Sequence, residues 1–170
     1  VQMVEARRGH IPVVHMANSG AIIGQSLGPT TMVRAGIMSY GYNPNPAMGS
    51  LGLRPALSWT SHISFLKQVD PGQTVGYGRT WTARRRTTIA TVPVGYADGY
   101  SRRLSNRGHV LIGGEFRPVV GRICMDQLMV DLGPNSTARV GDDVVLLGEQ
   151  AGHTITCLLY TSPSPRDGLL

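Results

Sequence analysis

Three glycine-containing motifs in the second half of the sequence carry the residues best suited to chemistry. Each motif places a reactive or polar side chain beside a glycine, where the backbone can approach a ligand closely because glycine has no Cβ. A β-domain that only packs against itself does not need tyrosine, aspartate and arginine gathered at its glycine bends. The motifs therefore indicate a functional site, and they span Gly76–Trp81, Val94–Tyr100 and Gly121–Asp126.

Tyr77 is the first candidate for acid–base chemistry, because Gly76 and Gly78 on either side leave its side chain with little steric cover. A free phenol has a pKa near ~10, so a tyrosine needs a neighbouring cation or hydrogen bond to act as a base. The alternative is a core tyrosine whose hydroxyl lies at the rim of the domain.

Ser19 and Arg34 are candidates for binding an anion. Ser19 follows a predicted strand end and is expected to cap a short helix over Ala21–Gln25, where its hydroxyl and the N–H groups of the first turn suit a phosphate. Most serine caps bind nothing, however. Arg34 lies in an otherwise apolar predicted strand and needs a partner there, which could be either a ligand or a local acidic residue.

The composition restricts the class of protein. The formal net charge is +6, with an arginine run at Arg84–Arg86. This charge is typical of solvated strand faces, although it could also attract anionic ligands or nucleic acid. No nucleic-acid-binding or zinc signature is present, and Cys124 and Cys157 form no disulfide or metal pattern. Without a signal peptide or an apolar run of ~18 residues, we expect no membrane partner and a cytoplasmic location.

The spacing of apolar residues predicts two domains. Residues 1–48 have an α/β pattern: the first residues are helical, and the runs Ile11–Ala17 and Met32–Ile37 are typical of buried parallel strands. Residues 49–156 change to a period of two, starting with one half-buried strand over 57–65. Short strands with frequent turns favour an antiparallel barrel or sandwich. Its further strands are expected at Val75–Ala83, Thr87–Val94, His109–Ile112, Glu115–Val120, Ile123–Leu132 and Asp143–Leu147, with a hairpin at Gly113–Gly114.

The two ends of the sequence do not fit this pattern. The chain starts as if inside a helix, so we expect that it is a fragment. Residues 157–170 have no periodicity and are expected to be a foreign tail, with a Pro/Ser-rich disordered tail as the alternative.

Over residues 1–156 the motifs together resemble the carboxy-terminal part of alanine racemase, a pyridoxal-phosphate enzyme. The resemblance implies the last units of a parallel (β/α)8 barrel, incomplete over 1–48, followed by an antiparallel β-barrel-like domain. It also implies a two-base interconversion of L- and D-alanine that supplies D-alanine for peptidoglycan. The implied assembly is a homodimer in which the β-domain of one subunit completes the active site of the other.

The resemblance assigns the cofactor-binding residues. Arg34 matches the arginine that bonds the pyridine nitrogen of pyridoxal phosphate, and His15 matches the histidine that supports it. Ser19, with the backbone at Gly36 and Ile37, matches the phosphate-binding groups. Since arginine does not give up its proton, this arrangement would keep the ring nitrogen unprotonated.

The same resemblance assigns the catalytic and substrate residues. Tyr77 matches the tyrosine of a Tyr-Gly-x-Thr motif that exchanges a proton on one face of the substrate, while a lysine serves the other face. Tyr96 and Met125 match residues at the substrate, and Arg102 and Asp126 match residues of the gate. Taken alone, Met125 could equally fill a core, and Arg102 and Asp126 could form an ordinary surface pair.

The departures from the family pattern limit this interpretation. Lys67 is the only lysine in the sequence, and it does not match the cofactor-linking lysine. We therefore expect that this chain alone is inactive and that residues 1–48 have low stability in isolation. A related racemase with broad or serine specificity is one alternative, and a stand-alone β-domain that acts as a binding module is another.

Overall fold

The computed structural model describes residues 1–157 and divides into two compact units, of which the first is Val1–Leu57 and the second begins at Ser58. The predicted foreign tail lies outside the described residues, apart from Cys157.

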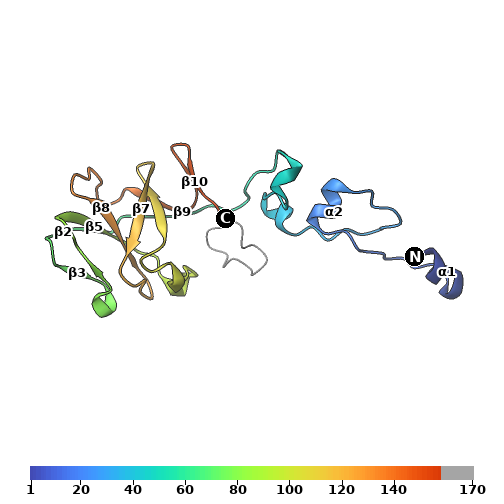
Figure 1. Cartoon of the computed structure of the whole chain (residues 1–170), viewed down its shortest axis with the longest axis horizontal. Coiled ribbons are helices and arrows are strands. Elements are labelled where there is room, and N and C mark those ends of the chain that lie inside the picture. Colours follow the sequence, from blue (N-terminus) through green and yellow to red (C-terminus); the bar gives the residue numbers. More distant parts are fainter. Residues whose placement is uncertain (158–170) are drawn as a thin grey trace. The chain divides into compact units, whose positions relative to one another are not determined.

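The first unit is built from short helices and extended segments. The expected amino-terminal helix is present as α1 (Gln2–Arg8), and α2 (Ser19–Gly24) follows. Two 3-10 turns, Ile37–Tyr40 and Pro46–Met48, complete the regular structure of this unit. Both helices are labelled in Figure 1.

The prediction of two strands in the first unit, at Ile11–Ala17 and Met32–Ile37, is wrong, although these two segments are extended and lie side by side. The N–H groups of Thr31 and Met32 donate to the Val14 carbonyl at 3.0 and 3.2 Å, and the Arg34 N–H donates to the Ala17 carbonyl at 2.8 Å. These bonds rise along both segments, as in a parallel pair, but no regular strand forms among residues 1–57. A parallel strand is normally buried within a sheet that is covered on both faces. Among residues 1–57, these two segments have no further strand beside them.

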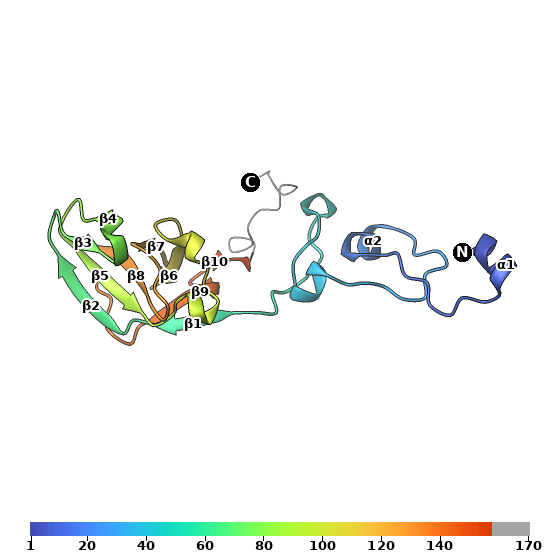
Figure 2. The same ribbon diagram turned by 90° about the horizontal axis from the view of Figure 1, so that it is seen from below.

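The second unit is an antiparallel barrel, as predicted. Its main sheet has the order β1-β9-β6-β7-β8-β5-β2, with β10 also paired to β9, and β3 and β4 form a separate pair. Figure 1 shows β5, β8 and β7 side by side, and Figure 2 shows β3 beside β4. The strands are β1 (Trp59–His62), β2 (Phe65–Val69), β3 (Thr74–Val75), β4 (Trp81–Thr82), β5 (Thr87–Val92), β6 (His109–Ile112), β7 (Glu115–Val120), β8 (Leu128–Gly133), β9 (Asp143–Gln150) and β10 (His153–Ile155).

The barrel closes at the junction between its first two strands. The single strand expected over residues 57–65 breaks at Ile63 and Ser64, so that β1 pairs with β9 whereas β2 pairs with β5. At the break, the Ile63 N–H donates to the Asp142 carbonyl and the Ser64 N–H donates to the Thr91 carbonyl, both at 2.9 Å. The two ends of the strand order are therefore consecutive in the chain, so one bent segment joins them and closes the sheet into a barrel.

Alternating apolar residues fill the barrel. In β8, Leu128, Val130 and Leu132 are buried and their neighbours are half-buried, which is the period-two pattern of a strand with one face inward. Burial of each such aliphatic side chain stabilises the fold by about 1.5–3 kcal/mol. Tyr100 is also fully buried and meets Trp59 edge-on, with ring centroids 6.0 Å apart.

Sequence reasoning located some strands better than others. β6 and β7 have the expected bounds, and both glycines of their connecting turn have positive φ, 61° at Gly113 and 78° at Gly114, as a two-residue type I′ hairpin requires. The long strand expected over 75–83 is wrong, because a 3-10 turn separates β3 from β4. The strand expected from Ile123 begins only at Leu128, after a turn.

Candidate functional site

Tyr77 projects from a tight turn between β3 and β4. The turn, Tyr77–Arg79, is flanked and interrupted by glycines with φ of 77° at Gly76 and 71° at Gly78, in the left-handed region that side chains disfavour. The Tyr77 side chain is 72% exposed, so the alternative of a core tyrosine does not hold. The glycines thus bend the chain so that the phenol points into solvent.

A second turn, Tyr96–Asp98, presents Tyr96. The Asp98 carboxylate accepts a hydrogen bond from the Gly95 N–H at 2.9 Å, which fixes the start of the turn. Tyr96 is 43% exposed, and the Arg102 guanidinium lies over its ring, 5.1 Å from the centroid. Such a cation–π contact at an exposed position stabilises by about 0.5–1 kcal/mol.

The segment that follows β7 lies between these two turns. On one side, a Cβ added to Gly76 would lie 3.2 Å from the Arg122 nitrogen, so the Tyr77 turn packs directly on this segment. On the other side, the Tyr96 N–H donates to the Cys124 carbonyl at 3.0 Å, and the next N–H donates to the Met125 carbonyl at 2.9 Å. The three motifs found in the sequence therefore form one continuous surface of the barrel.

Met125 lies on this surface with its side chain 58% exposed, which contradicts the alternative that it fills the core. Asp126 and Arg102 are also exposed, but among residues 1–157 no ion pair joins them. Their suggested surface pair is therefore wrong in this structure, because the Arg102 side chain lies over Tyr96 instead.

Cys124 lies next to Met125 and is buried. Burial raises the pKa of its thiol, and the negative charge of Asp126 raises it further, because both disfavour the thiolate. Its Sγ lies 3.7 Å from the Arg122 carbonyl, to which the thiol donates. Burial and a raised thiol pKa thus make Cys124 a poor nucleophile.

The predicted phosphate-binding groups meet in the first unit. The residue that caps α2 is Asn18, whose Oδ1 accepts from the Ala21 N–H, so the expected cap by Ser19 is wrong. Ser19 is instead 5% exposed, and its Oγ accepts hydrogen bonds from the N–H groups of Gly36 at 2.8 Å and Met38 at 3.5 Å. The hydroxyl therefore lies at the start of the Ile37–Tyr40 turn, beside backbone donors.

Arg34 and His15 are both exposed in the structure. The Arg34 guanidinium donates to the Met16 carbonyl at 3.4 Å, which places it beside the segment that carries Ser19. No described hydrogen bond joins His15 to Arg34, so the expected support of the arginine by the histidine stays a prediction. The remaining donors of Arg34 are available to a ligand.

Sequence reasoning missed the residues that hold the Tyr77 turn and the Met125 segment in place. Asn106 contacts both of them through its side chain, and Ser105 contacts Ile123. A run of Ser, Asn and Gly near a motif indicates a turn, but not which distant segment that turn contacts.

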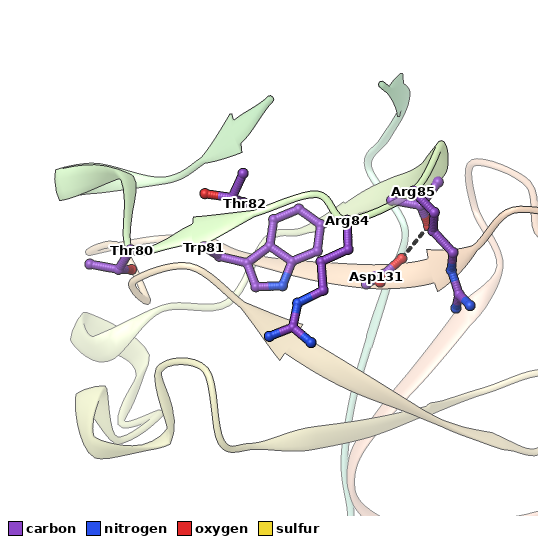
Figure 3. Close-up of a pocket in the computed structure, with 7 residues that line it drawn as sticks. Thr80, Trp81, Thr82, Arg84, Arg85 and Asp131 are labelled. Atoms are coloured by element: carbon purple, nitrogen blue, oxygen red, sulfur yellow. Dashed lines mark hydrogen bonds between the residues drawn. The ribbon is translucent and has the colours of Figure 1, made fainter. Parts of the chain in front are cut away.

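A pocket of about 580 Å³ lies beside this surface, at the connection between β4 and β5. In Figure 3, the Arg84 side chain extends alongside the Trp81 ring, and a hydrogen bond joins Thr87 to Asp131. Of the motif residues that surround Tyr77, the pocket contains Thr80 and Trp81 but not Tyr77 itself. Its lining residues are Thr80, Trp81, Thr82, Arg84, Arg85, Thr87 and Asp131.

Residues 1–157 contain no group of three or more His, Cys, Asp or Glu side chains that could hold a metal ion. None of the helices described is long and apolar enough to cross a membrane.

Comparison with known proteins agrees with this geometry. Residues 1–44 match the family model "Alanine racemase, N-terminal domain", and residues 56–160 match "Alanine racemase, C-terminal domain". The alanine racemase of Cutibacterium acnes is 64% identical over 156 residues, which are 92% of this chain and 42% of that protein. That of Halothermothrix orenii is 48% identical over 147 residues, covering 86% of this chain and 39% of that protein.

Solved structures give the same result. The crystal structure of alanine racemase from E. faecalis superposes with a TM-score of 0.82 at 34% identity, covering 94% of this chain and 43% of that one. Alanine racemase of Clostridium difficile 630 in complex with cycloserine gives a TM-score of 0.78 at 43% identity, covering 88% and 40%. The chain thus spans about two fifths of the length of the curated relatives it matches. It belongs to the alanine racemase family.

Proposed function

We propose that the protein to which this chain belongs is a pyridoxal-phosphate enzyme that interconverts L- and D-alanine and so supplies D-alanine for peptidoglycan. The observation that carries the proposal is the surface on which Tyr77, Tyr96 and Met125 lie together, each on its own glycine-bounded turn or segment. A racemase must remove a proton from one face of the α-carbon and return one to the other face. An exposed phenol on a rigid turn is suited to one of these two transfers.

The first unit fits the phosphate of the cofactor. A buried serine hydroxyl and the backbone N–H of Gly36 already lie 2.8 Å apart, with the N–H groups of the following turn alongside. Such a combination of hydroxyl and turn N–H groups is what a phosphate oxygen needs. We assign Ser19, Gly36 and Ile37 to the phosphate.

Arg34 is assigned to the ring nitrogen of the cofactor, with His15 as its support. When bound, pyridoxal phosphate withdraws electrons from the α-carbon and so makes its proton acidic. An arginine at the ring nitrogen donates a hydrogen bond without transferring its proton. Its role is therefore to keep that nitrogen unprotonated, which limits side reactions such as transamination.

Tyr77 is assigned to the proton on one face of the substrate. The second proton-transfer group of the family is a lysine, and Lys67 is a poor candidate for it, since this residue is exposed in β2 opposite Ile89. We therefore assign the second group to a lysine outside this sequence. Met125 would bind the substrate carboxylate through its backbone N–H, and Tyr96, Arg102 and Asp126 would line the entrance.

We propose that this surface works across a homodimer. Tyr77 and Met125 are 72% and 58% exposed. Large side chains exposed side by side in this way are typical of a surface that a partner covers. In the proposed assembly, the β-domain surface of one subunit faces the cofactor-binding residues of the other.

The test is a chimeric enzyme in which residues 1–156 replace the matching segment of the Cutibacterium acnes alanine racemase. We expect the chimera to racemise alanine, and Tyr77→Phe to abolish exchange of the α-proton with deuterated solvent for one enantiomer while sparing the other. Tyr40→Phe is the matched control, because Tyr40 is also an exposed tyrosine. Equal loss of exchange for both enantiomers would contradict the role of Tyr77, and faster turnover of serine than of alanine would contradict the substrate.

A further inference from the structure

Asn106 joins two parts of the proposed site that are distant in the sequence. Its Oδ1 accepts a hydrogen bond from the Gly121 N–H at 2.7 Å, at the start of the segment that carries Met125. Its Nδ2 donates to Thr80 Oγ1 at 3.2 Å, directly after the turn that carries Tyr77. We infer that Asn106 is a positioning residue, which fixes the Tyr77 turn relative to the Met125 segment; the catalytic part of this inference rests on the proposed function.

The two partners require a side chain that accepts from the Gly121 N–H and, at the same time, hydrogen-bonds to the Thr80 hydroxyl. The Gly121 N–H can only donate, so the oxygen of the Asn106 side chain must face it, and the amide NH₂ must then face Thr80. An apolar side chain of similar size would satisfy neither partner. Both contacts therefore depend on a side chain with polar atoms on two sides.

The backbone at Asn106 also favours this residue. Its φ is 58°, in the left-handed region, where asparagine is one of the few residues other than glycine to occur with any frequency. The conformation turns the side chain between two segments that lie 15 and 26 residues away.

The neighbouring residue provides a second connection to the same segment. Ser105 Oγ accepts from the Ile123 N–H at 3.1 Å and donates to the Arg102 carbonyl at 2.7 Å. Ser105 therefore holds residue 123, while Asn106 holds residue 121 and also bonds to Thr80, directly after the Tyr77 turn. Removal of Asn106 would leave the segment attached to the barrel but without the hydrogen bonds that connect it to that turn.

The Tyr77 turn and the Met125 segment also touch through glycines, but this van der Waals contact is not directional as a hydrogen bond is. A Cβ added to Gly121 would lie 2.8 Å from the Val75 carbonyl oxygen, so the two backbones are in close contact. Such a contact prevents the two backbones from coming closer, but it does not prevent one from sliding along the other. Two hydrogen bonds to the same amide restrict both movements. Since displacement of a catalytic group by about 1 Å can reduce a rate by about 100-fold, loss of this restraint should be visible in turnover.

The structural part of the inference can be tested on the 170-residue chain itself. Asn106→Gly removes both hydrogen bonds but tolerates the positive φ, so the barrel should stay folded, with an unfolding midpoint lowered only by the loss of these two bonds. We expect the Gly121 amide to exchange with deuterium at least about tenfold faster by NMR, because it loses its acceptor. Asn135→Gly is the matched control, since Asn135 is an exposed asparagine in the loop after β8.

The catalytic part is tested in the chimeric enzyme. We expect Asn106→Gly to lower kcat by about tenfold or more with KM nearly unchanged, and to slow α-proton exchange mainly for the enantiomer that depends on Tyr77. Asn106→Asp should restore most of the activity, because a carboxylate can accept from both the Gly121 N–H and the Thr80 hydroxyl. Asn135→Gly should leave kcat unchanged.

The outcomes separate this inference from the proposed function. Unchanged exchange at Gly121, or an unchanged kcat in an active chimera, would overturn the positioning role. Equal slowing of exchange for both enantiomers would also overturn it, because a general loss of structure does not select one face. If the unsubstituted chimera is inactive while Gly121 exchange responds to Asn106→Gly, the proposed function fails and the structural restraint stands.

Discussion

Gly95 allows the Tyr96 turn to lie against the segment that carries Met125, and Gly95→Ala should separate them. The added Cβ would lie 2.3 Å from both the carbonyl carbon and oxygen of Met125, and 2.4 Å from the Cys124 carbonyl oxygen. Ordinary contacts between such atoms are about 3.5 Å, so the backbones must move apart by about 1.2 Å. The φ of Gly95 is −138°, which any residue adopts, so the expected cost comes from this contact alone.

The magnitude follows from the interactions that such a movement removes. Two backbone hydrogen bonds, of 3.0 Å from Tyr96 to Cys124 and 2.9 Å from Ala97 to Met125, would lengthen to about 4 Å and be lost. Each contributes about 0.5–1.5 kcal/mol, and overpacking adds about 1–3 kcal/mol. We expect the free energy of unfolding to fall by about 2–6 kcal/mol, with a Tm lower by at least about 8 °C for a domain of this size.

Thermal unfolding of the 170-residue chain, followed by circular dichroism, measures this effect. Gly141→Ala is the control, because a Cβ at Gly141 would meet nothing within 4 Å, and its φ of 94° alone is unfavourable. The control should cost about 1–2 kcal/mol from backbone strain. If Gly95→Ala lowers the Tm no more than Gly141→Ala does, the close approach of the two backbones is not what holds the turn.

Two further predictions concern residues near the site. In a Cys157→Ser background, Cys124 should react with iodoacetamide at pH 8 more slowly than a free cysteine does, because burial and Asp126 raise its thiol pKa. Asp126→Asn removes a negative charge, so the pKa should fall and the rate should rise; an unchanged rate would show that Asp126 has no influence. Asp131→Ala should lower the free energy of unfolding in urea by about 1–3 kcal/mol, because the buried Thr87 hydroxyl and the Gly133 N–H both lose their acceptor. Adding Thr87→Val should recover part of this loss, and a double variant no more stable than Asp131→Ala would contradict the explanation.

The barrel was predictable from the sequence where strands end at strong turn signals. The hairpin at Gly113–Gly114 indicated the bounds of β6 and β7, because two consecutive glycines can both adopt the positive φ that a two-residue hairpin turn requires. The Tyr77 turn was missed as a turn because its apolar and polar residues continue the period of a strand. There the positive φ of Gly76 and Gly78 overrides that period.

The residues of the site could be predicted from the sequence, but the hydrogen bonds that hold them together could not. Tyr77, Tyr96 and Met125 belong to motifs that can be read along the chain, whereas the contacts of Asn106 join residues 15 and 26 positions apart. No local pattern encodes such a pair. Similarly, the apolar runs in the first unit are typical of parallel strands, but strand formation depends on neighbours that the pattern itself does not supply.

The pairing of β9 with both the first and the last strand of the barrel has a consequence for how this domain can be rearranged. Trp59, at the start of β1, lies opposite Leu147, and Ile155, at the end of β10, lies opposite Gly148. Adjacent strands are about 4.8 Å apart, so Trp59 and Ile155, which both lie beside β9, are within about 10 Å of each other. Neighbouring ends are the geometry that permits circular permutation and insertion of a domain into a host loop. A short linker could therefore join residues 155 and 59 of the barrel directly.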